Sequence, residues 1–120
     1  MKDFHKLKVW EKAHSLTLKV YLTTQDFPKV EIYGLTSQMR RSSASIPTNI
    51  AEGCGRSSKA ETIQFFNIAT GSSSELEYQL ILANDLHYLA NEPYSELSEE
   101  IIEVRRMLYA FIQKLKLDIS

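Results

Sequence analysis

The stretch SKAETIQFFNIATGSSSELEYQLILANDLH, residues 58–87, decides the fold of this chain. Ser58 is followed three residues later by Glu61, a capping-box pattern in which each side chain bonds an amide left unpaired at a helix start. Apolar and small residues then recur at three- and four-residue steps without a proline, which predicts a helix of about 33 residues, roughly 50 Å long. Its predicted inner face is Phe65, Ile68, Ala69, Ser72, Leu76, Leu80, Ala83 and Leu86 or His87.

A first helix is predicted over residues 7–26, which carry one apolar face. Pro28 disfavours the helical conformation at Phe27, so this helix should stop near Asp26. The predicted inner face is Val9, Trp10, Ala13, Leu16, Val20 and Tyr21.

A second helix is predicted from around Glu31. Pro47 lies inside its pattern and should kink the helix rather than end it, because the apolar period continues beyond the proline. The glycines in residues 53–55 should end it with a glycine in the left-handed conformation. The predicted inner face is Leu35, Met39, Ser42, Ser43, Ile46 and Ile50, whose small members would let another helix approach closely.

A last helix should follow a turn made by NEPYS, residues 91–95. Its seam, close to a heptad repeat, is Leu97, Ile101, Val104, Leu108, Ile112, Leu115 and Ile119. Short connections favour antiparallel neighbours, so residues 1–120 are predicted to form one all-α domain, an antiparallel up-down-up-down four-helix bundle.

Composition is that of an ordinary globular protein, with 43% hydrophobic and 24% charged residues among 120. The single cysteine, Cys54, excludes an internal disulfide and fits the reducing cytoplasm. No segment approaches the about 20 apolar residues of a membrane span, so no membrane partner is expected.

Charge is distributed unevenly along the chain although its sum is only -1. Residues 1–60 contain ten Lys or Arg against five Asp or Glu, a balance of +5, and residues 61–120 contain four against ten, a balance of -6. Such asymmetry is typical of charged partners or self-complementary assembly. A head-to-tail ring could place the opposite signs across each contact between copies.

Candidate catalytic constellations are incomplete. Glu11 and His14 form one Glu-x-x-His motif, whereas a di-iron bundle needs two such motifs and two further carboxylates. Cys54 has no histidine near it in sequence and is interpreted as a small residue in a turn. His87 lies far from every arginine, which disfavours helical ribonucleases that place histidine shortly after arginine. We expect no catalytic residue, metal or cofactor, and a metal-dependent enzyme built on Glu11 and His14 is the weakest alternative.

Four cations are the candidate contacts to nucleic-acid phosphates. Arg56 and Lys59 flank a helix start that favours an anion, although plain capping explains the same residues and a complete phosphate-loop motif is missing. Arg40 and Arg41 are adjacent, about 100° apart on a helix. In one interpretation, one of the two borders the core and pairs with a carboxylate. In the alternative interpretation, they contact the phosphates of a nucleic-acid backbone.

Several stretches resemble the four-helix-bundle family encoded in intervening sequences of bacterial 23S ribosomal RNA genes. They are LKVWEKAH (7–14), FP (27–28), EIYGLTSQMRRSSASIPTNIAEGCGR (31–56), ETIQFFNIATGSSSELEYQLILA (61–83) and RRML (105–108). The resemblance implies an antiparallel protomer and, by analogy with the related accessory protein of diversity-generating retroelements, a homopentameric ring. Those relatives bind nucleic acid and a reverse transcriptase through a basic surface, from which this chain departs in its net charge of -1.

The leading functional hypothesis is a non-catalytic oligomeric scaffold that contacts RNA or an RNA-processing partner. Its best phosphate contacts would be Arg40, Arg41, Arg56 and Lys59. The alternative is a protein–protein interaction module that binds no nucleic acid.

Overall fold

Four helices pack together in this protein, and the computed structural model contains no strand within residues 3–119, the part it describes. Met1, Lys2 and Ser120, which complete the predicted domain, lie outside those residues. The helices are α1 (Lys8–Thr24), α2 (Leu35–Cys54), α3 (Lys59–Asp85) and α4 (Asn91–Ile119), with short 3-10 turns η1 (Phe4–Lys6) and η2 (Lys29–Glu31). Across the same residues, none of these helices is long and apolar enough to cross a membrane.

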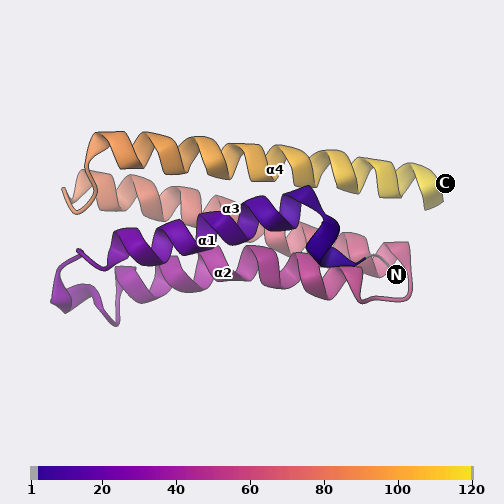
Figure 1. Cartoon of the computed structure of the whole chain (residues 1–120), viewed down its shortest axis with the longest axis horizontal. Helices are drawn as coiled ribbons and strands as arrows, with labels where there is room; N and C mark the ends of the chain where they lie inside the picture. The colour runs from indigo at the N-terminus through magenta and orange to yellow at the C-terminus, as the bar shows by residue number, and fades with distance from the viewer. Residues whose placement is uncertain (1–2, 120) are drawn as a thin grey trace.

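Figure 1 shows the order of the helices in space. The α1–α2 and α3–α4 connections lie at one end of the molecule, and the α2–α3 connection lies at the other. Each helix packs against two neighbours: α1 and α3 both contact α2 and α4. The molecule is elongated, 47 × 22 × 20 Å.

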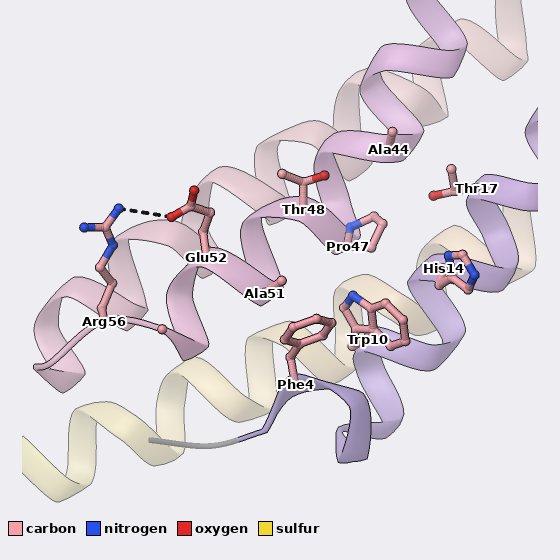
Figure 2. A pocket seen from close by; sticks show the side chains of 11 residues that line it. Phe4, Trp10, His14, Thr17, Ala44, Pro47, Thr48, Ala51, Glu52 and Arg56 are labelled. Atoms are coloured by element: carbon pink, nitrogen blue, oxygen red, sulfur yellow. Dashed lines mark hydrogen bonds and ion pairs between the residues drawn. The ribbon is translucent and has the colours of Figure 1, made fainter.

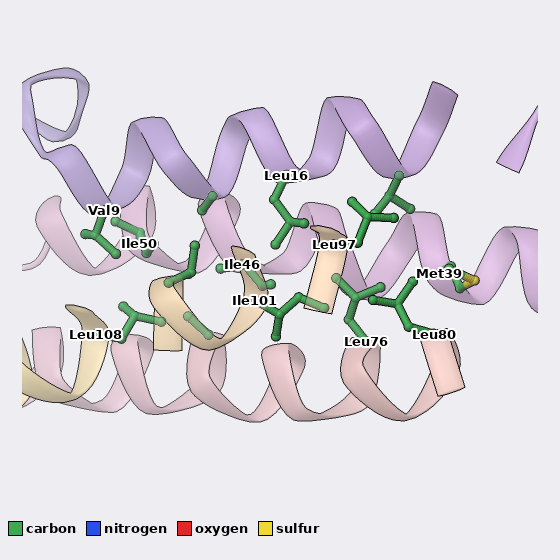
Figure 3. Close-up of a cluster of buried hydrophobic side chains, with 14 of the residues drawn as sticks. Val9, Leu16, Met39, Ile46, Ile50, Leu76, Leu80, Leu97, Ile101 and Leu108 are labelled. Carbon is green, nitrogen blue, oxygen red and sulfur yellow. The ribbon is translucent and has the colours of Figure 1, made fainter. Parts of the chain in front are cut away.

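The core lies along the axis between the four helices (Figure 3). All six inner residues predicted for the second helix are buried, as are the inner residues of the last helix from Leu97 to Ile112. In α1 the predicted face is only partly confirmed, since Trp10 is half-buried and Tyr21 is exposed. The largest fully buried side chains are Phe66, Leu16, Met39, Ile46, Ile50, Leu76, Leu80, Ile101, Leu108, Val20 and Val104.

Pro47 lies inside α2, and the helix continues across it to Cys54. Proline has no N–H, so the carbonyl of Ser43, four residues earlier, loses its helical partner. In its place the hydroxyl of Thr17 on α1 donates to Ser43 O at 2.9 Å and also lies 3.0 Å from Ala13 O. The hydrogen bond that α2 loses at Pro47 is thus replaced by one that joins α2 to α1.

Small side chains bring α2 and α3 close together, as the sequence predicts. The hydroxyl of Ser42 donates to Oε1 of Gln79 at 2.6 Å, and both groups are buried. A Cβ on Gly53 would lie 3.0 Å from the buried ring of Phe66, closer than ordinary contacts, so the glycine favours this close approach.

The start of α3 is confirmed, but its inner face is rotated from the prediction. Oγ of Ser58 accepts the N–H of Glu61 at 3.2 Å, as a helix cap should. Phe66 is fully buried in place of Phe65, and Ile68 is half-exposed. The helix has 27 residues rather than about 33.

Two predicted boundaries, the start of the second helix and the turn before the last one, are wrong for local reasons. The second helix begins at Leu35 because Glu31 enters η2 and caps α2 with its side chain. The second helix does end at the predicted glycines, since its last residue is Cys54, but the predicted left-handed cap is wrong. Gly55 has φ -85, and no described glycine has a positive φ, because tightened bonds from the Gly55 N–H satisfy the last carbonyls.

The turn before α4 is made by residues 86–90 and not by NEPYS, which forms the first turns of α4. Pro93 is tolerated there because amides in the first turn have no helical partner. His87, at φ 64, makes the reversal that a glycine would usually make.

Candidate functional site

Arg40, the first predicted phosphate contact, is held within the chain. Its Nε donates to the hydroxyl of Thr24 at 2.9 Å, one of its terminal nitrogens donates to Tyr21 O at 3.3 Å, and its guanidinium lies 4.9 Å from the centre of the Tyr21 ring. These contacts fasten α2 to the C-terminal end of α1. The arginine does border the core, but its partners are a hydroxyl and a carbonyl rather than a carboxylate.

Arg56 and Lys59 also have partners in the chain. Arg56 pairs with Glu52 at 3.0 Å, drawn in Figure 2, and lies 4.6 Å from the centre of the Phe65 ring. Lys59 pairs with Asp118 at 3.4 Å. All four of these charged side chains remain substantially exposed, and exposed pairs of this kind contribute little and open readily.

Arg41 differs from the other three cations. It is exposed, and within residues 3–119 it has neither a hydrogen-bond nor an ion-pair partner. Arg40 and Arg41 lie in the first half of α2, whereas Arg56 and Lys59 lie beyond its C-terminal end, so the structure does not gather the four predicted cations into one site.

The candidate metal and nucleophile residues are likewise separated from any ligand set. The rings of His14 and Trp10 stack with centroids 5.1 Å apart and an interplanar angle of 7°. Glu11 is exposed, and Cys54 is buried at the end of α2 rather than displayed in a turn. In the described part of the chain no group of three or more His, Cys, Asp or Glu could hold a metal ion.

Many charges of the two unlike halves are paired inside the molecule. Across the α1–α4 interface Lys12 pairs with Glu103 at 2.6 Å and Lys19 with Glu100 at 2.7 Å. Hydrogen bonding to Glu103 raises the pKa of Lys12, and the same bond lowers the pKa of the Glu103 carboxyl. Fewer charges are consequently left to hold one copy against another.

Glu31 connects two distant parts of the chain. Its Oε1 accepts the Leu35 N–H at 3.0 Å, and its Oε2 accepts the hydroxyl of Tyr88 at 2.9 Å. These two bonds, the backbone one first, lower the pKa of the carboxyl. The carboxylate thus ties the start of α2 to the α3–α4 turn.

A groove runs between α1 and α2 on the outside of the bundle (Figure 2). Trp10 and His14 form its α1 side, and α2 contributes the small residues Ala44, Thr48 and Ala51. We call these residues the α1–α2 groove. Sequence reasoning missed it, because the aromatic residues of α1 were assigned to the core.

The outward side of α3 is also unexpected. Tyr78 is 61% exposed and Ile68 is 50% exposed, although α3 already buries another apolar face in the core. The sequence did indicate a second apolar face, since the apolar residues of this helix are too many to lie on one face.

The fold defines a class, the all-helical proteins built from four packed helices. More particularly, the chain belongs to the 23S rRNA-intervening sequence protein family, whose model matches residues 5–110. This confirms the resemblance found in the sequence. Among curated proteins, none matches the chain.

A solved structure supports the same conclusion. A crystal structure of a protein of unknown function from the S23 ribosomal protein family of Bacteroides thetaiotaomicron VPI-5482 has a TM-score of 0.79 and 26% identity. The match covers 87% of this chain and 97% of that one. Neither the family nor this neighbour supplies an established activity or binding partner.

Proposed function

We propose that this protein is a non-catalytic cytoplasmic scaffold that assembles with copies of itself and presents the assembled surface to a macromolecular partner. The observation that carries the proposal is the set of large apolar side chains that stay exposed although the core is closed. Exposed apolar residues that cluster mark interaction surfaces, and some of these follow at three- and four-residue steps on one helix, as Leu18, Tyr21 and Leu22 do on α1. On the helices these exposed residues are Leu18, Tyr21, Leu22, Ile68, Tyr78, Ile81, Ile102, Tyr109, Leu117 and Ile119.

The assembly in this proposal is a closed head-to-tail ring of up-down-up-down protomers, the pentamer that the family resemblance implies. Connections at alternating ends of the molecule support that order of helices. A head-to-tail contact uses two unlike patches, and a ring forms when the rotation between copies closes.

Sedimentation of the purified chain at low and high salt tests the assembly. We expect one oligomer in both conditions, because apolar burial is not screened by salt. A monomer in both conditions would overturn the proposal.

The partner in this proposal is structured RNA or an RNA-processing protein. Arg41 on α2, Arg56 in the α2–α3 turn and Lys59 at the start of α3 support RNA, because they are at least partly exposed cations whose partners are absent or weakly held. Binding of a structured RNA should fall steeply as salt rises, and Arg56→Ala should weaken it.

Lys19→Ala is the matched control for Arg56→Ala, because it removes the same charge from the α1–α4 side. It should leave RNA binding nearly unchanged. No binding to RNA at low salt would contradict the RNA contact and leave a protein–protein interaction module.

A further inference from the structure

Gly71 lies in the middle of α3, and the protomer gives no reason for it. Glycine inside a helix destabilises it relative to alanine. A Cβ at Gly71 would meet no atom within 4 Å, in contrast to Gly53, where one would press on Phe66. The space above Gly71 is therefore open to another chain.

Apolar and charged residues surround Gly71 on the same side of α3. Residues 68, 71, 75 and 78 follow at steps of three and four and so share one face. Ile68 and Tyr78 are largely exposed there, and Glu75 is exposed as well. A helix that is apolar on more than one face is usually covered on each of them.

We propose that this α3 face, defined as Ile68, Gly71, Glu75 and Tyr78, docks into the α1–α2 groove of a second copy of the chain. The inference rests on the proposed self-assembly and names the two unlike patches that it uses. Gly71 within α3 of one copy and the small residues Ala44, Thr48 and Ala51 on α2 of the other allow the two helices to approach closely.

Charge and spacing fix the register of this contact. On α2, Arg41 lies seven residues before Thr48 and therefore on the same side of the helix. On α3, Glu75 lies seven residues after Ile68. We take the two helices to be antiparallel, with Ile68 lying over Thr48 of the second copy. Seven residues further along α3, Glu75 then lies next to Arg41 of that copy.

Arg41 and Glu75 are suited to pair across copies because neither has a partner among the described residues of its own chain. Neither has a hydrogen bond or an ion pair within residues 3–119. This assignment takes Arg41 out of the set of RNA contacts and places Arg56, which lines the same groove, beside the contact between copies; Lys59 stays in the set.

Charge reversal tests the register. By sedimentation at micromolar concentration, Glu75→Arg and Arg41→Glu should each weaken association by about tenfold or more, since like charges would face each other. The chain carrying both substitutions should associate as the wild type does, because the pair is restored with its signs exchanged. Glu99→Arg on α4, which reverses an exposed acid outside both patches, should have no effect.

Gly71→Leu tests the close approach with a side chain that the protomer can accommodate. It should dissociate the oligomer while circular dichroism keeps the helical signal of the wild type. The matched control, Ala60→Leu, adds bulk to an exposed position near the start of α3 and should leave the oligomer intact.

The outcomes separate the two proposals. A monomeric wild type would overturn self-assembly and this interface with it. A wild-type oligomer that persists in Gly71→Leu and in both charge reversals would overturn the interface alone. Failure of the double reversal to restore association would overturn the antiparallel register.

Discussion

At the scale of single residues, Thr17 and Pro47 act as one unit. Proline withholds an amide that the Ser43 carbonyl needs, and the Thr17 hydroxyl replaces it from another helix. Because Ser43 is fully buried, water cannot easily supply the missing bond. The apolar period on both sides of Pro47 predicted a helix that continues beyond the proline with a kink. It gave no sign of which side chain would bond the Ser43 carbonyl.

Thr17→Val should lower the free energy of unfolding by about 1–3 kcal/mol, because it keeps the shape of the side chain and leaves a buried carbonyl unpaired. Denaturant titration measures this. In a Pro47→Ala background the same substitution should cost clearly less, since the backbone amide that alanine restores at this position can bond Ser43 O. Equal costs in the two backgrounds would show that the two residues do not act together.

At the scale of elements, Glu31 determines where α2 begins and holds that end against the α3–α4 turn. Its lowered pKa makes this contact dependent on pH. A carboxyl whose folded pKa is depressed stabilises the fold above its unfolded pKa, and the contribution is lost as pH falls through the folded value.

The difference in stability between the wild type and Glu31→Gln should therefore be constant above about pH 5 and shrink as pH falls below 4.5, the usual pKa of the group. Urea titrations at a series of pH values measure it. Tyr88→Phe removes one of the two donors and should reduce this pH dependence. Glu99→Gln is the matched control, because Glu99 is exposed and has no partner within residues 3–119 to lose.

The helices could be predicted from the three- and four-residue spacing of their apolar residues. Which side of a helix faces the core could be predicted only where the helix has a single apolar face. In α2 and α4 one regular apolar stripe faces the core, so the buried positions follow from the sequence. In α3 apolar residues occupy two faces, and the period alone could not choose between Phe65 and Phe66. That ambiguity is itself informative, because the second face belongs to the candidate interface.

The candidate site was less predictable than the fold for a different reason. Whether a cation is available depends on neighbours that are distant in sequence. Arg40 bonds residues 16 and 19 positions earlier, and Lys59 meets a carboxylate 59 positions later. Sequence reasoning listed four cations and had no means of separating Arg41 from the others.

At the scale of the whole molecule, the protomer and the proposed assembly place different demands on the same helix. Gly71 weakens α3 in an isolated copy, and in the proposed interface it lets a second chain lie close over the helix. Stability and association should consequently change in opposite directions when this residue is replaced.

Gly71→Ala should raise the free energy of unfolding of dilute, monomeric protein by about 0.5–1 kcal/mol, the helix preference of alanine over glycine, and should weaken association. Gly53→Ala, the matched control, should lower stability by about 1–3 kcal/mol through overlap with Phe66. Denaturant titration and sedimentation on the same samples measure both quantities. A Gly71→Ala protein that associates as tightly as the wild type would contradict this view.

Thr17 and Pro47 also constrain the order in which this sequence could have evolved. A proline arriving at position 47 before the hydroxyl at position 17 would have buried an unpaired carbonyl, whereas a threonine arriving first would have bonded Ala13 O in its own helix at no loss. The threonine is thus the permissive change and the proline the dependent one. Once both are present the threonine cannot revert freely, because its loss would leave the Ser43 carbonyl unpaired, and we expect relatives that lack the threonine to lack the proline also.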